Sequence, residues 1–210
     1  MDPAEIRAAI EIERLDLAAE LDSLSPAEWS SPSLCAGWTV QDVVAHLTLA
    51  TRLGPLAAMG GVLKARGDIN RMIGDAARRR SAQFTPAQLI AQLRETAGSP
   101  KRPLGTQPPD PLVDMLVHGQ DIVRPLGRTR AMDPTRVAAV LPHAATSSFY
   151  GAGKRFVGLR LVATDLDWSM GSGEEVRGTG GQLLLLLTGR PAGLDGLAGP
   201  GAATAGARVA

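Results

Sequence analysis

The sequence has a single cysteine, Cys35, and aromatic residues make up only 3% of its 210 residues. One cysteine excludes an intrachain disulfide, which is typical of proteins from a reducing cytosol. The sequence has no large excess of positive or negative charge. Its 22 Lys and Arg residues nearly balance its 21 Asp and Glu residues, which leaves a net charge of +1. Since nucleic-acid-binding proteins usually carry a basic excess or stripe, the composition argues against a nucleic-acid partner.

Long hydrophobic runs are missing as well. The leucine run at 183–187 is far shorter than the about 20 apolar residues that a membrane-spanning helix needs. Charged residues between Glu5 and Arg14 interrupt the segment where a signal peptide would have its apolar region. We therefore expect a cytoplasmic protein without a membrane partner.

The only basic cluster is Arg78-Arg79-Arg80. Cations at the end of a helix complement its dipole and usually face solvent, so we expect a solvated helix end here. A nucleic-acid patch is the alternative interpretation.

Capping signals divide the first two thirds of the chain into helices. Thr39, with Asp42 three residues later, has the pattern of a capping box. Residues 98–110 are rich in proline and predict a loop, and 54–67 are interrupted by glycines. A polar residue followed by a proline predicts the start of a further helix. The expected helices cover 3–24, 68–83, 86–97, 111–124 and a segment from 134, in addition to the helix that begins after Thr39.

The pattern changes after about residue 155. Apolar residues alternate through "FVGLRLVATD", which predicts a strand, and "LDWSMGSGEEVRG" predicts two further short strands around a glycine turn. A helix is expected at 179–189, followed by a loosely ordered tail at 191–210. The predicted fold is mainly α, with a helical bundle in residues 1–150 and a small α/β region in residues 151–210.

The segment "DMLVHGQDI" places Asp114, His118 and Asp121 within about 60° of arc on one side of a helix. Such a stripe suits a helix that directs polar groups into a cavity, and it equally suits a short exposed face. Asp121 is also close enough to Arg124 in the sequence to form an ion pair with it. The spacing alone leaves a metal site, a salt bridge and a solvated surface open.

A second histidine, His46, lies at the edge of the apolar stripe of its helix. A histidine there is often a hydrogen-bonded boundary residue. The nearby Asp42 already serves as the acid of the capping box. Two histidines and a carboxylate on two bundle helices are nevertheless sufficient for a three-ligand metal site, which leaves a coordination position open for chemistry.

Three blocks of the sequence resemble the mycothiol-dependent maleylpyruvate isomerase family of the DinB-like metal-binding superfamily. They are "SLCAGWTVQDVVAHL" at 33–47, "VDMLVHGQDIVRPLG" at 113–127 and "EEVRGTGGQLLLLLTGRPAGLDGL" at 174–197. The blocks occur in the family's order and span most of the chain. The resemblance implies a DinB-like four-helix bundle that holds a divalent metal, commonly zinc.

The resemblance also implies the metal ligands, which are His46, Asp114 and His118. One departure matters, because the isomerase has glutamate where this chain has Asp114. Aspartate is one methylene shorter, so direct ligation needs a closer approach of the helices or a bridging water. Asp121 would then orient His118, since a metal-bound histidine usually donates its other N–H to a partner.

The function implied by the resemblance is metal-assisted thiol chemistry with mycothiol, a thiol of actinobacteria, and an electrophilic substrate. We expect a transferase or an isomerase in which the metal activates the thiol. The alternative is a non-catalytic metal- or thiol-binding or regulatory module of the same fold, and a third possibility has no metal. No residue set specific for maleylpyruvate is recognisable. The oligomeric state is not indicated.

Two further residues receive no catalytic role from the sequence. Cys35 has no histidine at a short spacing, which predicts a buried and inert thiol. His143 follows Pro142 late in the helix that begins at 134, and it matches no ligand of the family, so we expect it to be structural.

Overall fold

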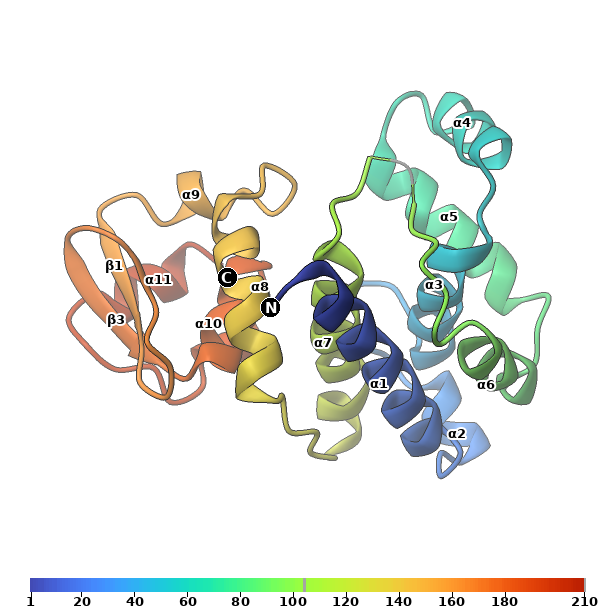
Figure 1. Cartoon of the computed structure of the whole chain (residues 1–210), viewed down its shortest axis with the longest axis horizontal. Helices are drawn as coiled ribbons and strands as arrows, with labels where there is room; N and C mark the ends of the chain where they lie inside the picture. The colour runs from blue at the N-terminus through green and yellow to red at the C-terminus, as the bar shows by residue number, and fades with distance from the viewer. Residues whose placement is uncertain (104, 210) are drawn as a thin grey trace. The chain divides into compact units, whose positions relative to one another are not determined.

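The computed structural model describes residues 1–103 and 105–209 (Figure 1). Leu104 of the expected loop and Ala210 of the expected tail lie outside the described residues. The chain forms two compact units, Met1–Arg130 and Ala131–Ala210, whereas the sequence suggested a division near residue 150. None of the helices found in the described stretches is long and apolar enough to cross a membrane.

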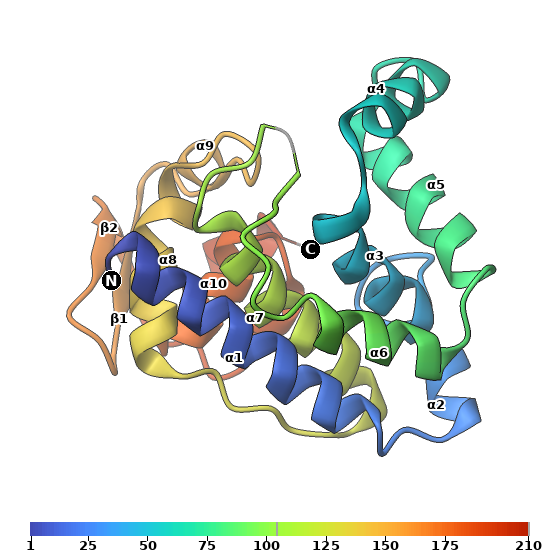
Figure 2. The ribbon, with the colours of Figure 1, turned by 45° about the vertical axis from the view of Figure 1, so that its right-hand side comes forward.

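The first unit is built from helices (Figures 1 and 2). Their bounds are α1 Pro3–Leu21, α2 Pro26–Ser30, α3 Val40–Arg52, α4 Pro55–Lys64, α5 Ile69–Ser81, α6 Pro86–Glu95, α7 Asp110–Val123 and the 3₁₀ turn η1 Arg124–Leu126.

Four of these helices form a bundle. The helices α1 and α3 each pack against both α6 and α7, so the four pairings close a ring around one core, and α5 packs on α3 from outside. The core contains Leu17 and Leu21 of α1, Val43 of α3, Leu93 of α6 and Met115 of α7. This arrangement confirms the predicted helical bundle.

Side-chain caps fix where the bundle helices begin. At the start of α3, the Thr39 hydroxyl accepts the N–H of Asp42 at 3.2 Å, and the Asp42 carboxylate accepts the N–H of Thr39 at 3.0 Å. This is the capping box that the sequence predicts. The helices α1 and α6 begin with the same reciprocal arrangement.

The segment that glycines interrupt carried no structural prediction, and residues 55–64 form the helix α4. A proline at the first helical position and several strong helix formers outweigh the cost of two interior glycines. The helix leaves Leu56, Met59 and Leu63 exposed.

The second unit begins with a helix that the sequence placed in the bundle region. This helix, α8 (Pro134–Thr146), packs on α10 and α9. The other elements are α9 Ala152–Arg155, β1 Leu159–Ala163, β2 Ser169–Gly171, β3 Glu174–Gly178, α10 Gly180–Leu187, the 3₁₀ turn η2 Pro191–Leu194 and α11 Ala202–Ala207.

The three strands form a sheet of order β2-β1-β3. Strand β1 is antiparallel to β2 and parallel to β3, so the two later strands flank β1 and do not pair with each other. Glycines permit the short crossing between them. A Cβ on Gly173, whose φ is +122°, would lie 2.1 Å from the carbonyl oxygen of Gly158.

The tail also differs from the expected loose order. Residues 191–209 contain η2 and α11, and an isolated bridge joins Arg177 to Ala198. Small residues explain the order, because they allow the tail to approach the sheet closely. Gly201 is one example, since a Cβ there would lie 2.9 Å from the carbonyl oxygen of Glu174.

Candidate metal centre

Three possible metal ligands gather between two helices of the bundle. His46 of α3 and Asp114 and His118 of α7 place ligand atoms within 4.8 Å of one another. The two imidazole rings meet edge to face, with centroids 4.9 Å apart and planes at 76°. His46 and Asp114 are half-buried, and His118 is only 9% exposed. The structure thus brings together all three residues that the resemblance implied.

The position of α7 explains this gathering. Asp114 and His118 are one turn apart, so they lie on the same side of the helix. Both flanks of α7 are covered, because the helix packs against α1 and α3. Most of its residues are buried, including Asp121 at 0% exposure. The polar stripe of α7 therefore faces the interior of the bundle and is not a solvated surface.

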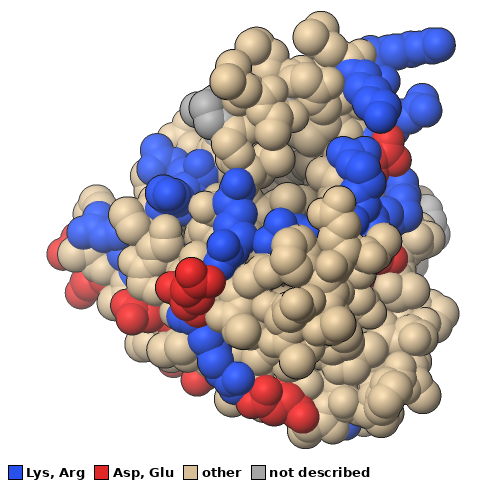
Figure 3. Space-filling model, turned by 90° about the vertical axis from the view of Figure 1, so that its right-hand side faces the viewer, with Lys and Arg blue, Asp and Glu red and all other residues tan. Residues whose placement is uncertain are grey.

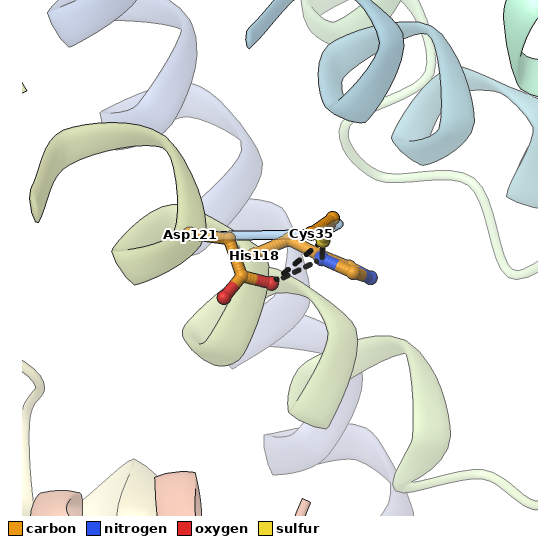
Figure 4. Close-up of side chains that lie close together, drawn as sticks. All are labelled: Cys35, His118 and Asp121. Carbon is orange, nitrogen blue, oxygen red and sulfur yellow. Dashed lines mark hydrogen bonds and ion pairs between the residues drawn. The ribbon is translucent and has the colours of Figure 1, made fainter. Parts of the chain in front are cut away.

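Asp121 lies directly behind His118. Its Oδ2 atom is 2.8 Å from Nδ1 of the imidazole, within the same helix. Figure 4 shows that the other ring nitrogen points away from Asp121. With the Nδ1 atom engaged in this way, Nε2 is the nitrogen that His118 offers to a ligand.

Cys35 is the site residue that sequence reasoning missed. Its Sγ donates to Oδ2 of Asp121 at 3.2 Å and lies 3.7 Å from Nδ1 of His118 (Figure 4). The thiol is half-buried, and with His118 and Asp121 it forms a second group of potential ligand atoms. Sequence spacing gave no sign of this contact, because the histidine lies 83 residues away along the chain.

The loop that carries Cys35 is fixed against α7. The N–H of Leu34 donates to the backbone oxygen of Asp121 at 3.0 Å, and an isolated bridge between Pro32 and Thr39 closes the loop. The same loop supplies Trp38, whose ring meets that of His46 edge to face, with centroids 5.5 Å apart. One loop thus contacts both histidines of the cluster.

Electrostatics favour a charged pair in the absence of a metal. Burial alone lowers the pKa of His118, but the hydrogen bond to Asp121 and the contact with Cys35 outweigh it and raise the pKa to about 10. At neutral pH the metal-free site therefore holds an imidazolium next to a carboxylate. Binding of a cation at Nε2 requires that this nitrogen lose its proton.

The other polar residues considered from the sequence lie outside the cluster. Asp42 caps α3 and also accepts a hydrogen bond from Ser81. His143 is half-buried on α8 in the second unit, and none of the ligand groups found among the described residues includes it.

The basic cluster at the end of α5 divides into two parts. Arg78 and Arg79 are exposed, whereas Arg80 turns inward, donates to the Thr48 hydroxyl at 2.6 Å and lies over the ring of Phe84. Figure 3 shows Lys and Arg side chains at the upper right of this face and in a band across its middle.

The fold and the cluster define a class of protein, a four-helix bundle with histidine and carboxylate donors projecting between two of its helices. Residues 10–136 match the family model "Mycothiol maleylpyruvate isomerase N-terminal domain". The chain belongs to this family.

Two solved structures share the fold. A mycothiol-dependent maleylpyruvate isomerase aligns with a TM-score of 0.57 and 16% identity over 95% of this chain and 93% of that one. A histidine-to-alanine mutant of that isomerase aligns with a TM-score of 0.55, at the same identity and coverage. A comparison with curated protein sequences gave no match.

Proposed function

We propose that the protein is a metal-dependent thiol enzyme, a transferase or isomerase that uses mycothiol as cosubstrate. His46, Asp114 and His118 would hold one divalent metal ion, which we propose to be zinc. The observation that carries this proposal is the gathering of their ligand atoms within 4.8 Å, with buried Asp121 behind His118. Membership in the isomerase family supports the choice of mycothiol.

The donor set fits such a metal ion. Two imidazoles and one carboxylate are common zinc ligands, and tetrahedral bonds of about 2.1 Å would place them about 3.4 Å apart. Donor atoms that already lie within 4.8 Å can reach that separation through small side-chain rotations. Asp114 belongs to the cluster, so its shorter side chain does not keep it away from the two histidines.

The chain's own residues prepare the site. Asp121 holds the Nδ1 proton of His118 and thereby keeps the Nε2 lone pair directed to the cluster. Trp38 packs against the His46 ring in a T-shaped contact. Three protein ligands leave a coordination position for an exogenous group.

A thiol needs the activation that such a site provides. With an ordinary pKa near 8.5, a thiol is only about 3% thiolate at pH 7. A divalent metal held by His46, Asp114 and His118 would supply this activation, because coordination favours the deprotonated sulfur. An electrophilic substrate next to this sulfur would undergo conjugation, or addition followed by isomerisation.

The first test is metal content by elemental analysis, on protein purified without an affinity tag or chelator and dialysed after addition of zinc. We expect close to one metal per chain in the wild type and in the control His143→Ala, and a loss in His118→Ala. Absence of metal from the wild type would contradict the proposal.

The second test is turnover. The metal-loaded protein is supplied with mycothiol and a panel of electrophiles that includes maleylpyruvate, and the loss of electrophile is followed. Saturable consumption that requires both thiol and His118 is expected. Bound metal without any such turnover would instead support a non-catalytic metal- or thiol-binding module.

A further inference from the structure

A cavity lies in the first unit, and none of the clustered ligands lines it. It has a volume of about 140 Å³ and is formed by the first half of α1, the loop at 99–102 and the start of α7. Its lining combines apolar side chains, such as Ile6 and Ile10, with four cationic ones. The cations are Arg7, Arg14, Lys101 and Arg102. Among its described lining residues there is no Asp or Glu.

Arg14 is the most informative of the four, because it is only 2% exposed. Its Nη1 atom donates to the carbonyl oxygens of Thr96, Ala97 and Ser99 at 2.9 to 3.2 Å, beyond the end of α6. Within the described part of the chain, its other two nitrogens make no hydrogen bond and no carboxylate pairs with it. Burial lowers the pKa of Arg14, and no described carboxylate raises it again.

A comparison within the first unit shows that a buried arginine without a carboxylate partner is unusual. The other strongly buried arginine, Arg130, is paired with two carboxylates, Glu13 at 2.7 Å and Glu20 at 2.9 Å. An arginine cannot relieve its burial by losing its proton, because its intrinsic pKa is too high. A buried guanidinium without a counter-charge is costly, so an anion that entered the cavity would be stabilised.

The remaining cations are available to the same anion. Arg7 and Lys101 are exposed and form no ion pair with any described residue, and Arg102 uses its Nε to donate to the backbone oxygen of Thr106 at 3.0 Å. Arginine forks match carboxylate and phosphate geometry. The apolar part of the lining favours an organic carboxylate over inorganic phosphate. Ile6 and Ile10 can bury a short hydrocarbon chain, which inorganic phosphate lacks.

We propose that this cavity binds a small organic carboxylate, with its charged groups on Arg7, Arg14 and Lys101 and its carbon chain against Ile6 and Ile10. None of the three clustered ligands of the candidate metal centre lines the cavity, so the site is distinct from that centre. The proposal is independent of the proposed thiol chemistry.

Calorimetric titration tests the proposal with succinate and inorganic phosphate as probes. The titrations use the full chain, both as wild type and as His118→Ala, so that carboxylate binding to a metal at the other site is recognised. The double variant Arg7→Ala/Lys101→Ala removes two exposed cations of the cavity. Lys64→Ala/Arg79→Ala removes two exposed cations elsewhere in the same unit and is the matched control.

We expect saturable binding of succinate that His118→Ala and the control variant retain and that Arg7→Ala/Lys101→Ala weakens at least tenfold. Phosphate is expected to bind more weakly than succinate. Three results would overturn the proposal: no saturable binding of either probe, equal binding by the two double variants, or phosphate affinity equal to or above that of succinate.

Discussion

The imidazole of His118 and the carboxylate of Asp121, three residues apart on α7, form a buried pair with Nδ1 2.8 Å from Oδ2. The pair decides which nitrogen of His118 faces the other candidate ligands. It also links the histidine to the loop that carries Cys35, because the same carboxylate oxygen accepts the thiol.

Replacement of Asp121 by asparagine tests the role of this pair. Asn keeps a hydrogen-bond acceptor of similar shape but removes the negative charge that supports the basicity of His118. We expect the affinity for the metal to fall about 10- to 100-fold, as for other residues that support a metal-bound histidine. Competition with a chromogenic chelator measures the affinity. The exposed Asp167→Asn is the control and should match the wild type.

The raised pKa of His118 predicts a pH-dependent stability of the metal-free protein. The pKa is about 6.5 in the unfolded chain and about 10 in the folded protein, so the folded state holds the proton more tightly. The resulting stabilisation is fully present below about pH 6.5 and is lost as the pH rises through about 10.

Urea unfolding with a chelator present, at several pH values for the wild type and His118→Gln, measures this effect. The difference in free energy of unfolding between the two proteins should shrink by a few kcal/mol from about pH 6 to about pH 10. A difference that stays constant over this range would show that the pair does not bind the proton as described.

Cys35 should stabilise the buried carboxylate through its S–H donor. Cys35→Ala leaves Asp121 with one donor fewer, which we expect to lower the free energy of unfolding of the metal-free protein by about 1–2 kcal/mol. Cys35→Ser keeps a donor at nearly the same position and should recover part of the loss. Chemical denaturation compares the three proteins, and equal losses for Ala and Ser would refute a hydrogen-bonding role.

The buried pair of Arg130 and Glu13 should contribute far more to stability than a more exposed pair. Glu13 is 2% exposed, so Glu13→Gln leaves a charge on Arg130 with one counter-charge fewer. We expect a loss of about 1.5–3 kcal/mol in the free energy of unfolding, because Glu20 still pairs with Arg130. Glu28→Gln, at the more accessible pair with Arg128, should cost much less, because solvent screens that pair. Similar losses at both positions would contradict this prediction.

Local patterns in the sequence predict most of the helices, α4 excepted, and half of the site. Capping signals lie next to the residues they cap, so the starts of α3 and α6 are correct. Helical spacing is also a local property of the sequence, and it correctly places Asp114 and His118 on one side of α7. Their meeting with His46 depends on how α3 packs against α7, and only the resemblance to a known family supplied it.

The features that sequence reasoning missed depend on contacts between distant segments. The proximity of Cys35 to His118 requires the loop before α3 to dock on a helix that begins 75 residues after this cysteine in the sequence. The strand order β2-β1-β3 follows from a crossing at Gly158 and Gly173, which alternation of apolar residues does not encode. The packing of α8 in the second unit is likewise a tertiary property.

Asp121 contacts the loop at 31–39 through two different groups. Its backbone oxygen accepts the N–H of Leu34, while its side chain accepts the thiol of Cys35. The loop and the His118 side chain therefore belong to one cooperative unit, since the loop cannot detach without disturbing the carboxylate that orients the ring. Hydrogen exchange at the Leu34 amide would consequently report how often the histidine loses its alignment, without any need to observe the ring itself.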